Sequence, residues 1–266
     1  MINFETLCIS SCRIVEETAD FILAEWSKFS HHDIKEKGTH NFVTYVDKQS
    51  ERRLVEGLQQ LLPASVFLTE EQTIETKKGE YTWIIDPLDG TTNYIHHLSP
   101  VAISVALYYQ NEPIVGIIYE VSKKECFYTW KNGPAWLNNR TIKVSNRSKV
   151  RDSLIATGFP YYDYSKVQGM LQSLEFFFRN SHGVRRLGSA ATDLAYVACG
   201  RFEAFYEYGL NPWDVAAGSF LVQQAGGKVS DFSGMNNFLF GKEIVACNSH
   251  VFDEFLADIK RLFATT

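Results

Sequence analysis

Apolar residues recur at helical spacing in several parts of the chain, with charged residues between them. From Phe4 to about Phe29 such positions alternate with Glu and Lys, which predicts a long amphipathic helix at the start. A second helix is predicted from Lys48 to about Leu62, with Asp47 as its N-cap. Further helices are predicted at 167–178, from 188 through 198, and from 211 onward.

Short apolar runs between these helices predict strands. The runs lie at 42–45, 66–69, 83–85, 101–109, 113–121, 125–130, 154–156 and 201–208. The three runs between 101 and 130 are separated only by turn residues, which predicts an antiparallel meander. Helices mixed with parallel and antiparallel strands indicate an α/β (α+β) fold with mixed sheets and helices on several faces.

Two polar stretches interrupt the pattern. His31 to His40 has no periodicity and predicts a surface loop, whose irregularly spaced histidines favour solvated side chains over metal ligands. The segment 145–152 is the stretch most like an internal boundary. We therefore expect one domain over 1–266, with a subdomain boundary near 145–152.

Composition and net charge limit the classes of binding partner that we expect. Hydrophobic residues make up 45% and charged residues 21%, typical of a globular protein, and the net charge of −5 argues against nucleic acid or an anionic membrane. The first residues lack a basic signal region and no apolar run is long enough to span a membrane, so we expect a cytoplasmic protein. Five cysteines without a C-x-x-C motif favour reduced thiols; Cys8 and Cys12, one turn apart, could share a metal or a disulfide, but an apolar helix stripe is favoured.

Residues that could bind a metal ion or a phosphate are most concentrated at 81–94, Y-T-W-I-I-D-P-L-D-G-T-T-N-Y. Pro87 is expected to end the strand at Asp86, and Asp89 follows across a tight turn, so that both carboxylates can face one pocket. Oxygen ligands at this spacing suit Mg²⁺ better than Zn²⁺. Gly90 begins a small polar stretch at a predicted helix start, whose N–H groups could hold a phosphate. The alternative is an ordinary turn.

Other candidates each have a plain structural alternative. Glu70 and Glu71 are adjacent carboxylates at a strand end, which is costly unless a cation binds there or both are solvated. Asp214 could be an ordinary helix cap, and the turn at 157–158 could lack a function. Small residues at 188–191 open a helix and offer a second anion or hydroxyl site.

Two long motifs carry a resemblance to a known family. W-I-I-D-P-L-D-G-T-T-N-Y at 83–94, followed by W-D-V-A-A-G-S-F-L-V-Q-Q-A-G-G at 213–227, resembles the signatures of the inositol monophosphatase family of Mg²⁺-dependent, Li⁺-inhibited phosphatases. The resemblance extends over nearly the whole chain. It implies a layered α/β/α/β/α sandwich, usually a homodimer, with two to three Mg²⁺ ions and a small phosphate monoester as substrate.

The resemblance also implies roles for individual residues. The implied metal ligands are Glu70, Asp86, Leu88 through its carbonyl, Asp89 and Asp214, and the implied catalytic residues are Asp47, Thr91 and Glu70. Four converging carboxylates would repel one another unless more than one cation neutralised them, so Asp86 is expected to bridge two ions. The predicted substrate contacts are Asp89, Gly90, Thr91, Thr157, Gly188, Ser189, Ala190, Glu207 and Asp214. Direct attack by a metal-activated water is favoured, because no Ser-His-Asp arrangement or phosphoenzyme motif is visible.

The substrate is the most open question. Glu207 matches the acceptor for an inositol hydroxyl, and a carboxylate there would repel a second phosphate, which favours inositol 1-phosphate or a similar polyol monophosphate. Alternatively, Glu207 pairs with a surface cation such as Arg201. Relatives with the same metal motifs hydrolyse 3′-phosphoadenosine 5′-phosphate, fructose bisphosphate, histidinol phosphate or NADP, and a non-catalytic regulatory role is the alternative outside enzymology.

Overall fold

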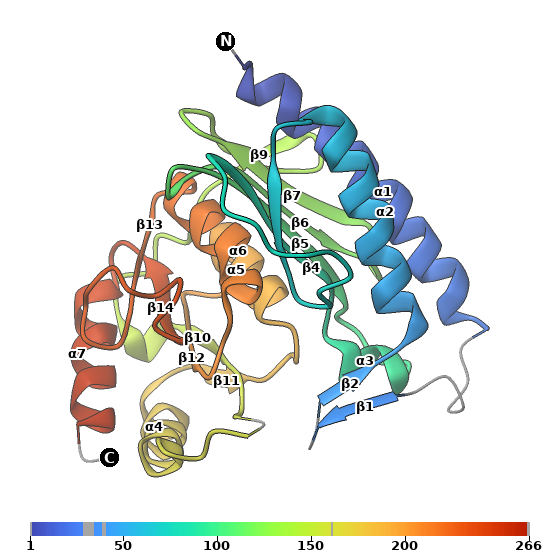
Figure 1. The fold of residues 1–266 in the computed structure, drawn as a ribbon. Coiled ribbons are helices and arrows are strands. Elements are labelled where there is room, and N and C mark those ends of the chain that lie inside the picture. The colour runs from blue at the N-terminus through green and yellow to red at the C-terminus, as the bar shows by residue number, and fades with distance from the viewer. Residues whose placement is uncertain (1, 29–34, 39–40, 161, 265–266) are drawn as a thin grey trace.

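The chain folds into five layers, seen edge-on in Figure 1. This computed structural model describes residues 2–28, 35–38, 41–160 and 162–264. Helices α1 (Phe4–Trp26) and α2 (Tyr45–Leu61) cover the outer face of a seven-stranded sheet. Helices α5 (Ala190–Ala198) and α6 (Pro212–Gln224) lie between this sheet and a five-stranded one, whose other face carries α4 (Val167–Asn180) and α7 (Phe252–Phe263). The expected α/β sandwich with mixed sheets is confirmed.

The seven-stranded sheet runs in the order β3-β4-β5-β6-β7-β8-β9. Its strands are β3 (Val66–Thr69), β4 (Tyr81–Asp89), β5 (Ala102–Tyr109), β6 (Glu112–Glu120), β7 (Glu125–Trp130), β8 (Ala135–Leu137) and β9 (Arg140–Ile142). The pair β3 and β4 is parallel and every following pair is antiparallel. The predicted meander from 101 to 130 is therefore confirmed as β5 to β7.

The five-stranded sheet has the order β11-β10-β12-β14-β13. Its strands are β10 (Leu154–Thr157), β11 (Gly183–Arg185), β12 (Ala204–Tyr208), β13 (Gly227–Ser230) and β14 (Glu243–Asn248). Strand β10 is parallel to both of its neighbours, whereas β14 is antiparallel to β12 and β13. The polar segment 145–152, which contains the short 3₁₀ helix η2 (Val150–Asp152), joins β9 of one sheet to β10 of the other.

Three apolar clusters hold the layers together. Ile22, Leu54 and Trp83 belong to the cluster that packs α1 and α2 on the seven-stranded sheet. A central cluster joins the two sheets through α5 and α6, and a third packs α4 and α7 on the outer face of the five-stranded sheet. Helix α6 is buried continuously from Val215 to Val222, which explains its run of apolar and small residues on all sides.

The prediction of a loop from His31 to His40 is partly wrong. Strands β1 (Lys35–Gly38) and β2 (Asn41–Val43) form a small antiparallel hairpin there, although the sequence lacks an alternating apolar pattern. His31, His32 and His40 lie outside the described residues. All five cysteines are free thiols, as expected. Among the helices that the structure describes, none has the length and apolar character needed to cross a membrane.

Candidate active site

Strand β4 delivers the first pair of carboxylates through a bulge. The sequence predicted that the strand ends at Asp86, but β4 continues through Pro87 to Asp89, and its register against β5 shifts between Asp86 and Asp89. Pro87 is tolerated because bulged residues leave the ladder and need no N–H donor. The Leu88 N–H donates to Asp86 Oδ1 at 2.9 Å, which fixes one oxygen of this carboxylate. A bulge, rather than a tight turn after the strand, therefore aims both carboxylates.

Two glycines in the left-handed region bring the end of β4 against the segment before α5. Gly90 and Gly188 both have φ of +92°, a conformation that glycine adopts without strain. A Cβ on Gly90 would lie 3.0 Å from the Pro100 carbonyl oxygen and 3.2 Å from that of Gly188. The Asn93 side chain donates to the carbonyls of Pro100 and Leu187 at 2.8 and 2.9 Å and so joins the same segments.

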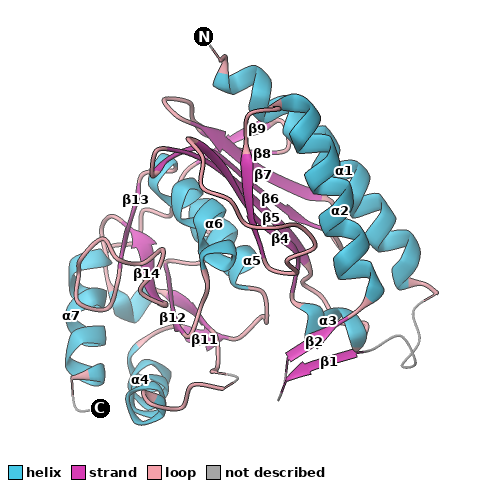
Figure 2. Cartoon of the chain, viewed as in Figure 1, coloured by secondary structure: helices cyan, strands magenta, loops and turns pink. Residues whose placement is uncertain are grey.

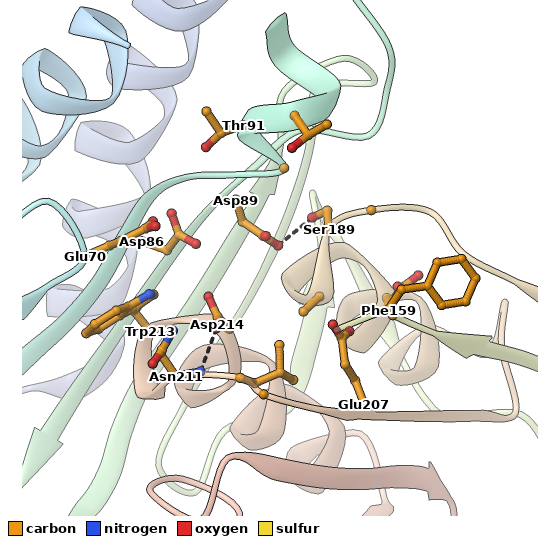
Figure 3. Close-up of a pocket in the computed structure, with 18 of the residues that line it drawn as sticks. Glu70, Asp86, Asp89, Thr91, Phe159, Ser189, Glu207, Asn211, Trp213 and Asp214 are labelled. Atoms are coloured by element: carbon orange, nitrogen blue, oxygen red, sulfur yellow. Dashed lines mark hydrogen bonds between the residues drawn. The ribbon is translucent and has the colours of Figure 1, made fainter. Parts of the chain in front are cut away.

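The carboxylate of Asp89, the last residue of β4, lies at the N-terminus of α5. Ser189 Oγ and the Ala191 N–H both donate to Asp89 Oδ2, at 2.7 and 2.8 Å (Figure 3). Burial raises the pKa of Asp89 to about 6, and these donors, Arg186 and the Gly90 N–H oppose that rise. The helix start predicted to take a substrate anion therefore already binds a carboxylate of the protein.

Three more acidic residues complete this end of the pocket. Burial raises the pKa of Asp86 well above its usual value, and the neighbouring charges of Glu70, Asp89 and Asp214 raise it further. Asp214, at the start of α6, accepts the Asn211 N–H at 2.7 Å within a capping box and also faces the pocket. Asp214 is thus both an ordinary cap and a pocket residue, because a capping carboxylate has a second oxygen free to point outward.

Glu51 holds the segment that carries Glu70, and sequence reasoning missed it. This fully buried carboxylate of α2 accepts the Glu71 N–H at 2.8 Å, the Thr73 N–H at 2.7 Å and the Thr73 hydroxyl at 2.6 Å. The chain leaving β3 is thereby fixed beside β4. A charged residue on the apolar face of a predicted helix was the only signal that could have identified it.

Asp47 lies behind the pocket and reaches it through Thr91. The N-cap of α2 is Thr44, not Asp47 as predicted; Asp47 is the third helical residue and accepts the Thr44 N–H at 2.8 Å. Thr91, the first residue of the one-turn helix α3 (Thr91–Ile95), has its hydroxyl 3.1 Å from both Asp47 Oδ1 and the Leu88 carbonyl oxygen. Burial raises the pKa of Asp47, while hydrogen bonds from Thr44 oppose the rise.

These residues surround one cavity of about 470 Å³. Of the predicted site residues it is lined by Glu70, Asp86, Leu88, Asp89, Gly90, Thr91, Gly188, Ser189, Ala190, Glu207 and Asp214. Thr157 is outside the lining, because its side chain is fully buried and its hydroxyl donates to the Tyr206 carbonyl at 2.8 Å. The volume is sufficient for a sugar- or polyol-sized phosphate ester.

The donor chemistry of this cavity fits hard cations. Glu70, Asp86, Asp89 and Asp214 line one cavity; burial raises the pKa of Asp86 most, and the charges of the other three raise it further. Among the described residues, no three acidic, His or Cys side chains form a preformed metal cage. The carboxylates come from three segments of the chain, and Mg²⁺, which keeps several waters and takes only a few protein oxygens, suits such an open arrangement.

The opposite end of the cavity contains charged residues that sequence reasoning overlooked. Burial raises the pKa of Glu207 to about 8; the Asp89 charge adds to this rise and Arg186 opposes it. Asp193 of α5 and Arg186 line the same end, with the Arg186 guanidinium 5.7 Å from the ring centre of Phe159. Arg201, the alternative partner for Glu207, instead makes a bidentate pair with Glu125 at 2.6 and 2.7 Å. An acid within the apolar run of α5 was the available signal for Asp193.

An α/β sandwich with four carboxylates around a sugar-sized cavity is an arrangement suited to a metal-dependent hydrolase. The sequence model of the inositol monophosphatase family matches residues 5–262 of the chain. An inositol-1-monophosphatase of Mesorhizobium japonicum is 38% identical over 226 residues, 85% of each chain. A protein named Nus factor SuhB from Pseudomonas aeruginosa is 36% identical over 253 residues, 93% of each chain.

Solved structures agree with these sequence matches. The inositol monophosphatase of Anabaena superposes with a TM-score of 0.86 at 32% identity, covering 98% of this chain and 97% of the other. The SuhB protein of Bartonella henselae superposes with a TM-score of 0.89 at 32% identity, covering 94% and 96%. The chain therefore belongs to the inositol monophosphatase family.

Proposed function

We propose that the protein is a Mg²⁺-dependent phosphomonoesterase that hydrolyses inositol 1-phosphate or a similar polyol monophosphate. The observation that supports this most is that Glu70, Asp86, Asp89 and Asp214 line one cavity, from the segment after β3, from β4 and from α6. So many carboxylates repel one another and favour cation binding, and no basic cluster is needed to hold the phosphate if cations are present. The family to which the chain belongs is metal-dependent.

The proposed metal site consists of the four carboxylates and the Leu88 carbonyl. Glu70, Asp86 and the Leu88 carbonyl would hold one ion, and Asp86, Asp89 and Asp214 a second. When bound, Mg²⁺ neutralises these charges, lowers the pKa of an attacking water and stabilises the leaving oxygen. The orientation of Asp86 and Asp214 by backbone donors at 2.9 and 2.7 Å supports this assignment, because each retains an oxygen for a ligand.

Thr91 and Asp47 would orient the attacking water. The Thr91 hydroxyl has one hydrogen, which is directed at Asp47 Oδ1 or the Leu88 carbonyl, each 3.1 Å away. Its lone pairs are then available to accept a hydrogen bond from a water in the pocket. Asp47 is a buried acceptor that helps to set the direction of the Thr91 hydroxyl hydrogen. Asp47 therefore acts on the water only through Thr91.

Glu207 supports a polyol as the leaving group. Its carboxyl lies at the cavity end away from Asp86 and can accept a hydrogen bond from a ring hydroxyl (Figure 3). Arg186 is the only cation among the described residues that line the cavity, and it already opposes the charges of Asp89, Asp193 and Glu207. A second phosphate near Glu207 would therefore meet several acidic groups and one cation, which favours a monophosphate.

Relatives carry two kinds of name, inositol-1-monophosphatase and Nus factor SuhB, so a non-catalytic role is the second candidate. The carboxylate set around the cavity favours catalysis. Phosphate release should be measured with and without Mg²⁺ on inositol 1-phosphate, 3′-phosphoadenosine 5′-phosphate, fructose bisphosphate, histidinol phosphate and NADP. We expect Mg²⁺-dependent release, highest for inositol 1-phosphate; no release from any of these esters would reject the enzyme assignment, and a preference for the nucleotide would reject the polyol.

A further inference from the structure

Asp193 has a buried carboxyl that the protein leaves without a hydrogen-bond donor. It lies in the middle of α5, is only 1% exposed and lines the cavity at the end that contains Glu207. Its Oδ1 is fully buried and has no hydrogen-bond partner among the described residues. A buried acceptor of this kind is unfavourable for folding, so it requires an explanation in the function of the site.

Two other buried acids show what distinguishes Asp193. Glu120, which is 0% exposed and outside the cavity, also has one oxygen without a partner, Oε1, but its other oxygen accepts the Lys123 N–H at 2.6 Å. Glu203, which is 4% exposed and outside the cavity, accepts the Leu154 N–H at 2.7 Å and pairs with Arg147 at 3.4 Å. The fold therefore supplies donors to a buried carboxyl where the role is structural. No described residue donates to Asp193 Oδ1; burial and the charges of Glu207 and Asp89 raise the pKa of Asp193, and the charge of Arg186 lowers it.

Asp193 and Glu207 form an acceptor pair at one place in the cavity. A Cβ on Gly158 would lie 1.9 Å from Glu207 Cδ, so the Glu207 carboxyl rests directly on the Gly158 backbone and has a defined position. Asp193 lines the same cavity as Glu207, and after burial the charge of Glu207 raises the pKa of Asp193 most. Two acceptors therefore face the cavity beside one cation, Arg186.

We propose that Asp193 contacts the substrate and, together with Glu207, accepts hydrogen bonds from neighbouring hydroxyl groups of a ring polyol. This rests on the proposed phosphatase function and adds a specificity-determining residue to it. A ring polyol presents donors on adjacent carbons, which matches two adjacent acceptors. An aryl phosphate has no such donors and leaves both carboxyls unsatisfied, so Asp193 selects the polyol ester without taking part in the chemistry.

The kinetic test compares myo-inositol 1-phosphate with p-nitrophenyl phosphate in wild type and Asp193→Asn. The substitution keeps the shape but replaces one carboxyl oxygen by an NH₂ group, which cannot accept a hydrogen bond, so kcat/KM for the inositol ester should fall about tenfold, the scale of one hydrogen bond. The value for the aryl ester should change less than about twofold. An equal loss on both esters, or no loss on either, would overturn the proposal.

Thermal unfolding supplies a readout that does not depend on turnover. Asp193→Asn removes a buried carboxyl that has no donor for Oδ1, so Tm should stay the same or rise, whereas the matched control Glu203→Gln weakens a satisfied carboxyl and should lower Tm. A clear fall in Tm for Asp193→Asn would make Asp193 a structural residue and would overturn its role as a substrate contact.

Binding of free myo-inositol separates failure of this inference from failure of the proposed function. If the wild type releases no phosphate from any ester, the phosphatase proposal fails, but an upward Tm shift with myo-inositol that Asp193→Asn abolishes would still support the contact. An inositol-induced shift of equal size in both proteins would overturn the contact. The absence of a shift in the wild type would overturn it as well.

Discussion

The carboxyl groups at the two ends of the cavity differ in the hydrogen-bond donors that the protein provides for them. At one end Asp86, Asp89 and Asp214 each have an oxygen held by a protein donor between 2.7 and 2.9 Å away. At the other end no described donor reaches Asp193 Oδ1, and the pKa of Glu207 reflects only burial and neighbouring charges. The first end is therefore preorganised in orientation, and the second retains its full capacity to accept donors from a ligand.

This contrast indicates a division of labour within one site. Oriented carboxylates suit chemistry that is common to all substrates, because cations and an attacking water need fixed ligands. Unsatisfied acceptors suit selection, because a ligand that lacks the matching donors leaves them unpaired and binds less well. Variants at the first end should affect every phosphate ester alike, and variants at the second should change the ratio between esters.

The largest effect is expected at Asp86. Asp86→Asn removes the charge that the proposed metal site shares between its two ions, at nearly constant size. Mg²⁺-dependent phosphate release should fall more than about a thousandfold, or ~4 kcal/mol of barrier, for polyol and aryl esters alike. Circular dichroism should show an unchanged fold. A folded variant that turns over at the wild-type rate would remove Asp86 from the mechanism.

The next largest effect concerns Thr91. Thr91→Val keeps the size of the side chain but removes the hydroxyl that bridges Asp47 and the cavity, so kcat should fall about a hundredfold on both classes of ester. Thr91→Ser keeps the hydroxyl and should recover most of this loss in the same steady-state assay. If valine and serine behaved alike, the hydroxyl would not orient the water.

A smaller and substrate-dependent effect is expected at Gly158. A Cβ there would lie 1.9 Å from Glu207 Cδ, so Gly158→Ala must displace the Glu207 carboxyl. We expect kcat/KM for inositol 1-phosphate to fall several-fold while p-nitrophenyl phosphate is unaffected. The effect should disappear in a Glu207→Gln background, where the carboxyl is already lost; additive effects in this double-mutant cycle would contradict the mechanism.

The smallest expected effect is a pH dependence of stability. The pKa of Glu207 rises from an ordinary 4.5 to about 8 in the folded protein, and that of Asp193 is also raised, mainly because both are buried. Carboxyls with raised folded pKa values favour folding at low pH, and this contribution is lost as pH rises through the folded values.

In Mg²⁺-free buffer, Tm should therefore fall between about pH 5 and pH 8, by a few degrees for a chain of this size. Scanning calorimetry of wild type and the Asp193→Asn, Glu207→Gln double variant provides the check. The double variant should show a flatter slope, because two of the titrating groups are gone. Equal slopes would show that these carboxyls do not carry raised pKa values.

Local sequence pattern predicted most of the layered fold and much of the first end of the cavity. The strands at 66–69 and 125–130 were predicted within their observed bounds, because apolar runs between turn residues are local signals. The pairing of Asp86 with Asp89 and the position of Asp214 followed from two contiguous motifs. The β4 bulge and the cap at Thr44 were missed, because each depends on hydrogen bonds that the pattern does not encode.

The second end was less predictable for a physical reason. Asp193 is within an apolar helix and Glu51 is on a buried helix face, and only the tertiary fold shows that one lacks donors and the other has three. Thr157 shows the converse, because a polar residue in a promising turn donates its hydroxyl to β12 instead of the cavity. Long-range packing, rather than local motif, decides these cases.

The division between chemistry and selection is tested most directly by one set of kcat/KM values. Wild type, Asp86→Asn and Glu207→Gln should each be assayed with Mg²⁺ on myo-inositol 1-phosphate and on p-nitrophenyl phosphate. We expect Asp86→Asn to lower both values by a similar factor, and Glu207→Gln to lower only the inositol value, by about 1–3 kcal/mol. A preference ratio unchanged by Glu207→Gln, or altered strongly by Asp86→Asn, would contradict the account.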